Sequence, residues 1–186
     1  MPTPRVADGL VDGDRVADNG LACPDGTQPV RRTIALPDAD DQVQLEETGC
    51  VLDDGRFHGP YRRADLGGAT VEAGAYDHGL RTGPWQILMT PDGGGRAGDY
   101  VEGVEDGEWK SYWREGKVAW VGRFDHGRRV GHWTWYFEAG GPQQEGDFVD
   151  GLQDGAWRYY PGDPGGERTE HWRAGVRVDP DPPATP

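Results

Sequence analysis

The residues that could perform covalent chemistry are few in this sequence. Serine occurs once, as Ser111, and no nucleophile-elbow pattern surrounds it, so a Ser/His/Asp triad has no foundation. Cys23 and Cys50 could act as nucleophiles only beside a histidine. His58 follows Cys50 closely, but it lies in a glycine-rich turn, which favours a structural role for the cysteines. We therefore predict no catalytic residues and a protein that is not an enzyme.

Histidines and carboxylates are present, but their spacing follows the repeat and does not match the ligand spacing of a known metal-binding motif. His78 and His126 occupy equivalent positions of a repeat, two units apart. Strand spacing then puts them about 20 Å apart, whereas zinc ligands lie about 2 Å from one ion. The acidic stretches match no calcium loop, and the glycines at 93–95 lack the lysine of a phosphate loop. We predict no metal site and no cofactor.

Composition and charge limit the partners. The 186 residues carry a net charge of −14, and no segment is basic, which disfavours nucleic acid and anionic membranes. No window of 18 apolar residues is long enough to cross a bilayer. Only 34% of the residues are hydrophobic, but eight Trp and seven Tyr argue against disorder. A protein partner, in particular a cationic one, remains compatible with this charge.

A repeat of 24 residues organises most of the chain, and it runs through residues 50–178 as five full units and a closing half. Each unit reads G-x-[YF]-x-x-G-x-x-x-G-x-W, and Cys50 stands where later units carry the first glycine. Two columns define the repeat: the tryptophans Trp85, Trp109, Trp133 and Trp157, and the glycines Gly79, Gly103, Gly127 and Gly151. An unbroken register of this kind predicts a repeat architecture in which each unit is stabilised mainly by its neighbours.

Each unit has the composition of a β-hairpin. Runs of five to eight aromatic and β-branched residues alternate with glycine-rich turns, such as the turn predicted over 127–131. This favours an all-β fold, an elongated, single-layer antiparallel meander in which rings lie over glycines. Alternation along the strand puts the tryptophans on one face and Tyr112, Tyr136 and Tyr160 on the other. These three tyrosines are the candidate partner-binding face; the alternative is that they pack against their own neighbours.

The segments outside the repeat are predicted to be a cap and two tails. Residues 1–22 and 179–186 have the composition of disordered segments. Residues 23–49 are expected to form one or two strands, over 30–37 and 42–52, that cap the open end of the array. A Cys23–Cys50 bridge would hold this cap in an oxidising compartment, whereas both thiols would be free in the cytosol. The N-terminal stretch has no apolar run, so we expect either a cytoplasmic protein or, if a leader was removed, a cell-envelope or periplasmic one.

The repeat resembles the MORN family, in particular the variant repeats of bacterial proteins of the YwqK antitoxin type. The resemblance covers about 70% of the chain and rests on GAYDHGLRTGPW (74–85), GDYVEGVEDGEW (98–109), GRFDHGRRVGHW (122–133) and GDFVDGLQDGAW (146–157). CPDGTQ (23–28) with Cys50 is also similar to envelope proteins of this group, in which such a stretch pairs with a later cysteine. The resemblance implies a non-catalytic scaffold for protein–protein interaction. The alternative it implies is an antitoxin or immunity-type protein that neutralises one toxin.

Overall fold

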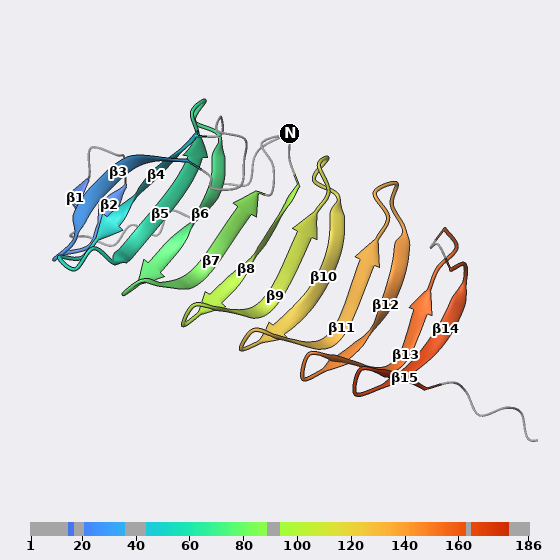
Figure 1. Cartoon of the computed structure of the whole chain (residues 1–186). Helices are drawn as coiled ribbons and strands as arrows, with labels where there is room; N and C mark the ends of the chain where they lie inside the picture. Colours follow the sequence, from blue (N-terminus) through green and yellow to red (C-terminus); the bar gives the residue numbers. More distant parts are fainter. Residues whose placement is uncertain (1–14, 17–20, 36–43, 89–93, 163–164, 179–186) are drawn as a thin grey trace, which may run out of the picture. The chain divides into compact units, whose positions relative to one another are not determined.

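The computed structural model describes residues 15–16, 21–35, 44–88, 94–162 and 165–178, and its β-strands are drawn in Figure 1. These residues form strands and turns without any helix, so the prediction of an all-β fold is confirmed. Consequently no helix in the described part of the chain is long and apolar enough to cross a membrane. The chain divides into two compact units, Met1–Leu80 and Arg81–Pro186.

The first unit is a small antiparallel sheet whose strands pair in sequence order. Its strands are β1 (Arg15–Val16), β2 (Ala22–Cys23), β3 (Gln28–Ala35), β4 (Gln44–Val51), β5 (Phe57–Asp65) and β6 (Thr70–Asp77). β3 pairs with β4, β4 with β5 and β5 with β6, while β1 and β2 form a separate two-stranded ladder. The two strands expected in the cap are therefore present, and their ladder continues directly into the first repeat.

The second unit is an antiparallel meander. Its strands are β7 (Leu80–Leu88), β8 (Gly95–Val101), β9 (Val104–Tyr112), β10 (Val118–Asp125), β11 (Arg128–Tyr136), β12 (Pro142–Val149), β13 (Leu152–Tyr159), β14 (Arg168–Arg173) and β15 (Val176–Val178). Each strand pairs with the next one along the chain, from β7 to β15. Figure 1 shows these strands following one another in one layer, so the predicted hairpin meander is confirmed.

The tight turns of the repeat are shorter than the sequence suggests. Between β10 and β11 the loop consists of His126 and Gly127 alone, with φ of 48° and 79°. Positive φ at both residues is the signature of a type I′ turn, whose twist matches that of the flanking strands. The turn predicted over 127–131 was therefore too long, because Arg128 to Gly131 already belong to β11. The strands begin before the tryptophan column, and they are eight or nine residues long through most of the array.

The tryptophans form the core of the second unit by lying over glycines of the neighbouring strand. Trp109, Trp133 and Trp157 are at most 1% exposed. A Cβ built on Gly122 would lie 2.1 Å from the Trp133 ring, and equivalent overlaps occur at Gly98 with Trp109 and at Gly146 with Trp157. Only glycine leaves room for a ring at this distance. The expectation that rings lie over glycines is thus confirmed for these units.

Hydrogen bonds fix each of these rings in the same orientation. The Trp133 Nε1–H donates to the carbonyl oxygen of Arg123 at 3.2 Å, ten residues earlier. Trp109 and Trp157 make the equivalent bonds to Asp99 and Asp147. Each indole also meets an aromatic ring edge-on, as Phe124 does with Trp133 at 5.1 Å and 87°. The core is therefore a row of rings with satisfied polar atoms, which suits a sheet that has no second layer.

Two predicted disordered segments fall largely outside the described residues. Of residues 1–22, the structure describes 15–16 and 21–22, and the pairs Arg15–Cys23 and Val16–Ala22 form the β1–β2 ladder. This ladder begins at Cys23, which is held by a disulfide. The prediction of disorder over 1–22 stays a prediction. Residues 179–186 lie outside the described part altogether.

Candidate functional site

The second unit has a shallow, open groove of about 400 Å³. It lies on the tryptophan side of the sheet, where β11 to β14 present their rings and turns. Its lining residues are Arg129, Trp135, Gln144, Phe148, Gly151, Leu152, Gln153, Trp157 and Gly175. The lining combines aromatic rings, one leucine, two amide side chains and a guanidinium. This is the mixed character of surfaces that bind peptides and proteins.

Stacked indole rings form the floor of the groove. Trp135 lies 5.6 Å from the ring of Trp133 and 5.6 Å from the ring of Trp157, with the planes tilted by 28° and 36°. Those two neighbours are buried, whereas Trp135 is half-buried and presents the remainder of its ring to the groove. Packing on both sides holds the Trp135 ring in place. A ring fixed in this way loses little side-chain entropy when a partner covers it.

Polar groups surround this aromatic floor. The Arg129 guanidinium carbon lies 4.8 Å from the Trp133 ring centroid and 5.4 Å from that of Phe148, so cation–π contacts hold it over the rings. Gln144 and Gln153 contribute amide groups to the lining. These groups can hydrogen-bond the backbone of an extended segment. No carboxylate belongs to the lining of this groove.

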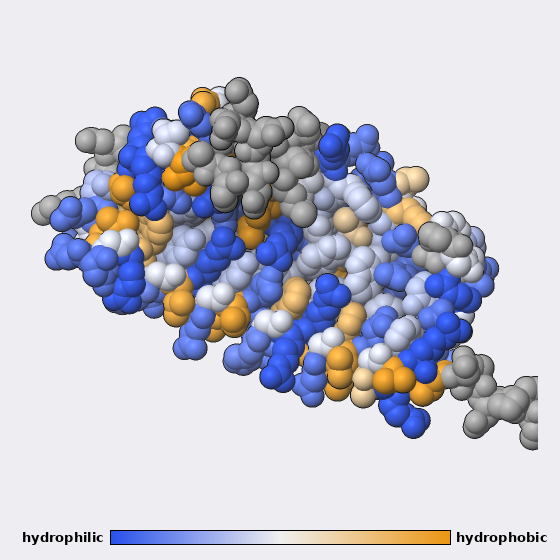
Figure 2. All heavy atoms as spheres, viewed as in Figure 1, coloured by the Kyte–Doolittle hydropathy of each residue, from blue (hydrophilic) through white to orange (hydrophobic). Residues whose placement is uncertain are grey.

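Leu152, which lines the groove, is one of several exposed aliphatic residues at the type I′ turns. Val149 and Leu152 face each other across the Asp150–Gly151 turn and are 55% and 48% exposed, and Val176 near the end of the array is 65% exposed. A Cβ built on Gly175 would lie 3.2 Å from Leu152, so this leucine packs beside the next turn. We call Val149, Leu152 and Val176 the aliphatic edge. Figure 2 shows hydrophobic residues gathered along the border of the molecule where these turns lie.

The three tyrosines of the sequence prediction do not line this groove. Tyr112, Tyr136 and Tyr160 are all half-buried. The Tyr160 hydroxyl donates to Glu145 Oε1 at 2.7 Å, and the Arg158 guanidinium lies 6.0 Å from its ring centroid. Tyr160 is therefore engaged with neighbours on its own face of the sheet. The prediction that the three tyrosines bind a partner stays a prediction.

The lone serine is part of the sheet packing. Ser111 is 7% exposed, and its hydroxyl donates to the carbonyl oxygen of Gly95 at 2.9 Å. Its Oγ proton is thus held by a backbone acceptor on the neighbouring strand β8. A structural role for Ser111 follows from this arrangement.

The first unit contains a buried ionic network that the sequence analysis missed. Glu47 is 4% exposed and accepts hydrogen bonds from the Tyr61 hydroxyl and from Arg32 Nε, both at 2.6 Å. Arg63 lies 3.5 Å from Glu47 and 3.2 Å from the equally buried Glu72. Glu47 and Glu72 do not belong to the tryptophan or glycine columns. Their only signal is an acidic residue at an inward position of an alternating strand.

The electrostatics of this network favour a charged Glu47. Burial on its own would raise the pKa of Glu47, but the hydrogen bonds from Tyr61 and Arg32 outweigh burial and hold that pKa below its usual value. Burial and the bond to Glu47 raise the pKa of the Tyr61 phenol. Tyr61 occupies the position at which later repeats carry tryptophan. A buried pair of this kind needs its partners and therefore fixes the packing of β4 against β5.

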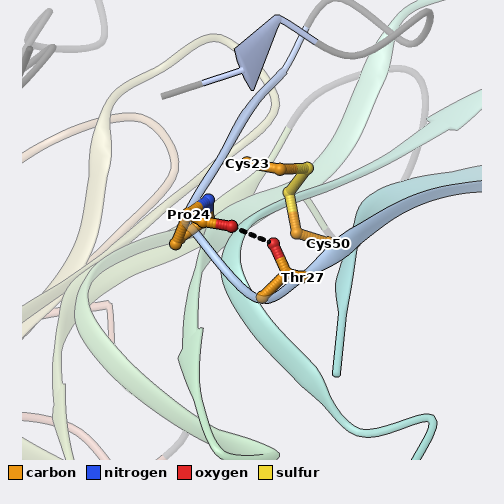
Figure 3. Close-up of a disulfide and its surroundings, with 4 residues drawn as sticks. All are labelled: Cys23, Pro24, Thr27 and Cys50. Atoms are coloured by element: carbon orange, nitrogen blue, oxygen red, sulfur yellow. Dashed lines mark hydrogen bonds between the residues drawn. A yellow bond between two sulfur atoms is a disulfide. The ribbon is translucent and has the colours of Figure 1, made fainter. Parts of the chain in front are cut away.

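The two cysteines form the bridge that the sequence left open. Cys23 and Cys50 are joined, with their Cα atoms 5.6 Å apart, and both are buried. Figure 3 shows the bridge beside the turn of residues 24–27, where the Thr27 hydroxyl donates to the carbonyl oxygen of Pro24 at 2.7 Å. A Cβ on Gly59 would lie 2.6 Å from Pro24, so this turn packs directly on β5. The bridge indicates, weakly, an oxidising compartment outside the cytoplasm.

Comparison with known proteins did not assign a family. A scan against protein-family models found no model that matches the chain, and a search of curated proteins found no similar sequence.

Proposed function

We propose that the protein is a non-catalytic, MORN-like repeat scaffold that binds another protein through the groove of its second unit. The observation that carries the proposal is the fixed aromatic floor around Trp135, with the partly exposed Leu152 in the same lining. Rigid tryptophan rings and an arginine held over aromatic rings, as Arg129 is, are typical of the residues that dominate binding at protein interfaces. The lining residues of the groove include no carboxylate, histidine, serine or cysteine, so the proposed role of this surface is binding.

The partner that fits this groove is a segment of a basic protein with an apolar anchor residue. The apolar anchor would pack between Trp135 and Leu152, and the amides of Gln144 and Gln153 would meet its backbone. The net charge of −14 would attract a cationic partner over a longer range and would make association faster at low salt. With the Cys23–Cys50 bridge, this favours a partner in the cell envelope or periplasm.

Affinity capture with the full chain, followed by mass spectrometry, tests the proposal. We expect Leu152→Asp to abolish capture of a basic protein that the wild-type chain retains, because it puts a charge at the centre of the apolar contact. Leu66→Asp is the matched control, since Leu66 is an exposed leucine of the first unit, outside the groove. It should leave capture unchanged. A stable one-to-one complex with a single partner would favour the antitoxin alternative over a general scaffold.

A substitution on the opposite face separates this site from the tyrosine face. Tyr136→Ala removes the central ring of the predicted tyrosine row without touching the groove lining. If Tyr136→Ala abolishes capture while Leu152→Asp does not, the partner binds the tyrosine face and the groove proposal is wrong.

A further inference from the structure

At the open end of the β5–β6 hairpin, away from its loop, three side chains bring metal-binding atoms together. His58 lies near the start of β5, Asp77 ends β6 and His78 is the first residue of the following type I′ turn. One donor atom from each side chain can be chosen so that all three lie within 4.8 Å of one another. His58 Nδ1 is 3.2 Å from Asp77 Oδ1, and His78 Nδ1 is 2.6 Å from the same oxygen.

The local hydrogen bonds cannot satisfy all the nitrogen and oxygen atoms of this group at the same time. His58 Nδ1 is also placed to accept the backbone N–H of His78, at 3.3 Å. If His58 Nδ1 accepts that bond, it carries no hydrogen and cannot donate to Asp77, so two acceptor atoms face each other at 3.2 Å. If it donates to Asp77 instead, the backbone bond is lost. One cation shared by the three side chains would satisfy the lone pairs of both imidazoles and of the carboxylate at once.

We propose that His58, Asp77 and His78 bind one divalent transition-metal ion, with zinc as the representative case. Two imidazole nitrogens and one carboxylate oxygen suit zinc, copper and nickel, and they do not suit calcium, which takes oxygen ligands. Tetrahedral ligands about 2.1 Å from zinc lie about 3.4 Å from one another. The observed 3.2 Å between His58 and Asp77 is already close to that spacing.

The surroundings leave a position open for water. The side chains of Asp77 and His78 are 63% and 59% exposed, and that of His58 is 27% exposed. Arg56 lies beside this group, and its Nη1 donates to the carbonyl oxygen of His78 at 3.2 Å. Its charge is offset by Asp54, 2.7 Å away. An ion bound here would join β5 to β6 and to the turn, and it would therefore stabilise the first unit.

The repeat supplies an internal comparison. The equivalent positions two units later carry Asp106, Asp125 and His126, which also gather within 4.8 Å. That group offers one imidazole and two carboxylates, and the His126 Nδ1 lies 4.0 Å from Asp106. With one nitrogen ligand in place of two, it should bind zinc more weakly than the first group. The sequence analysis compared histidines of the same column and overlooked His58 and His78, which are 20 residues apart on adjoining segments.

The test is zinc titration of the oxidised, untagged full chain against a chromophoric chelator, together with cobalt absorption spectra. We expect one tight site with the spectrum of a tetrahedral ion. His58→Ala and His78→Ala should each weaken that site by more than about tenfold. His126→Ala should change it by less than about twofold, because the two groups share no residue. Zinc should also raise the denaturation midpoint of the wild-type full chain, followed by circular dichroism, and fail to raise that of full-length His78→Ala.

Two outcomes would overturn the proposal. Either the wild-type chain binds zinc no more tightly than the His58→Ala/His78→Ala double variant, or His126→Ala weakens the tight site as much as His78→Ala does. Far-ultraviolet circular dichroism checks that each variant folds. If His58→Ala does not fold, His78→Ala carries the test alone, since His78 is an exposed turn residue.

Discussion

The contact between an indole ring and a glycine is the smallest unit on which the second part of the molecule depends. Trp133 lies over Gly122, donates to the Arg123 carbonyl and meets Phe124 edge-on, and the same set recurs one unit before and one unit after. Glycine is required there for space, because the φ of Gly122 is not in the left-handed region. The tryptophan and the glycine therefore form one packing pair, which explains why both recur with the same 24-residue spacing.

Gly122→Ala therefore tests the packing of this core. The new Cβ would overlap the Trp133 ring, and we expect the free energy of unfolding to fall by about 1–3 kcal/mol. Urea titration followed by tryptophan fluorescence measures this, because all eight tryptophans lie after residue 80. Gly67→Ala is the control, since its Cβ would meet only the Asp65 carboxylate at 3.2 Å. Because Gly67 lies in the first unit, both variants are also followed by far-ultraviolet circular dichroism, which reports on the strands of both units. A loss no larger than that of the control would contradict the packing described here.

The buried Glu47 makes the first unit sensitive to acid. Its pKa is lowered in the folded state, so the stabilisation it contributes is complete above the unfolded value of about 4.3 and is lost as the pH falls through the folded value. We expect Glu47→Gln to flatten the acidic part of the profile of unfolding free energy against pH. Tyr61→Phe, which removes a hydrogen bond to the carboxylate, should move that part of the profile to higher pH. An unchanged profile in Glu47→Gln would assign acid sensitivity to other groups.

At the scale of elements, the type I′ turn sets the register of each hairpin. Five such turns have a non-glycine residue at positive φ followed by glycine: His78, Glu102, His126, Asp150 and Ala174 come first in them. Asn, Asp and glycine adopt this conformation at least cost, whereas a Cβ without a polar partner is disfavoured. Ala174 is therefore the least favourable residue in this series.

Ala174→Asn is expected to raise the free energy of unfolding by about 1 kcal/mol, because asparagine tolerates the left-handed conformation that φ of 49° imposes. Ala174→Val is expected to lower it, since a β-branched side chain is strained there. Thermal unfolding of the two variants beside the wild type measures the difference. Equal midpoints for all three would show that the β14–β15 hairpin does not take part in the cooperative transition.

The type and order of the strands could be predicted from the sequence, but the residues at which they begin could not. Strand type, order and pairing follow from the 24-residue spacing and from the alternation around Trp109 and Trp133. The strand starts do not, because Arg128 to Gly131 carry the charge and glycine of a loop and lie in β11 all the same. Their backbone is paired with β10 and β12, so sheet hydrogen bonding overrides the local composition.

The candidate sites were harder to predict than the fold. The groove depends on Trp135, which is not part of the tryptophan column, and on Arg129 and Leu152. Arg129 falls within the turn predicted over 127–131, and Leu152 falls within the equivalent stretch of the next unit. The buried Glu47 and the His58, Asp77 and His78 group depend on contacts between neighbouring strands. Repeat spacing defines which residues are equivalent, but it does not reveal which non-equivalent ones meet.

For the whole molecule, the disulfide is the one covalent constraint on the first unit. It closes an interval of 27 residues, and in the chain-entropy model its removal costs about 3–4 kcal/mol. We expect the Cys23→Ser/Cys50→Ser variant to lose amide protection in β4 and β5 under native conditions. Hydrogen exchange with mass spectrometry measures this, and peptides from β10 to β13 provide the internal reference. Unchanged protection in β4 and β5 would show that the bridge is dispensable for the sheet.

The backbone hydrogen bonds of the turn glycines all run in one direction along the chain, from a later hairpin to an earlier one. The N–H of Gly127 donates to the carbonyl of Glu105 at 2.8 Å, and Gly103, Gly151 and Gly175 donate in the same way to a residue 22 positions earlier. Each hairpin therefore depends on an acceptor that its predecessor has already supplied. A truncation from the carboxyl end removes donor glycines, and every remaining turn glycine keeps its acceptor. A truncation from the amino end removes an acceptor and leaves the first remaining turn glycine without its hydrogen bond. During synthesis from the amino end, the carbonyl that accepts each of these hydrogen bonds is made before the glycine that donates it. The hairpins can therefore form one after another as the chain is synthesised.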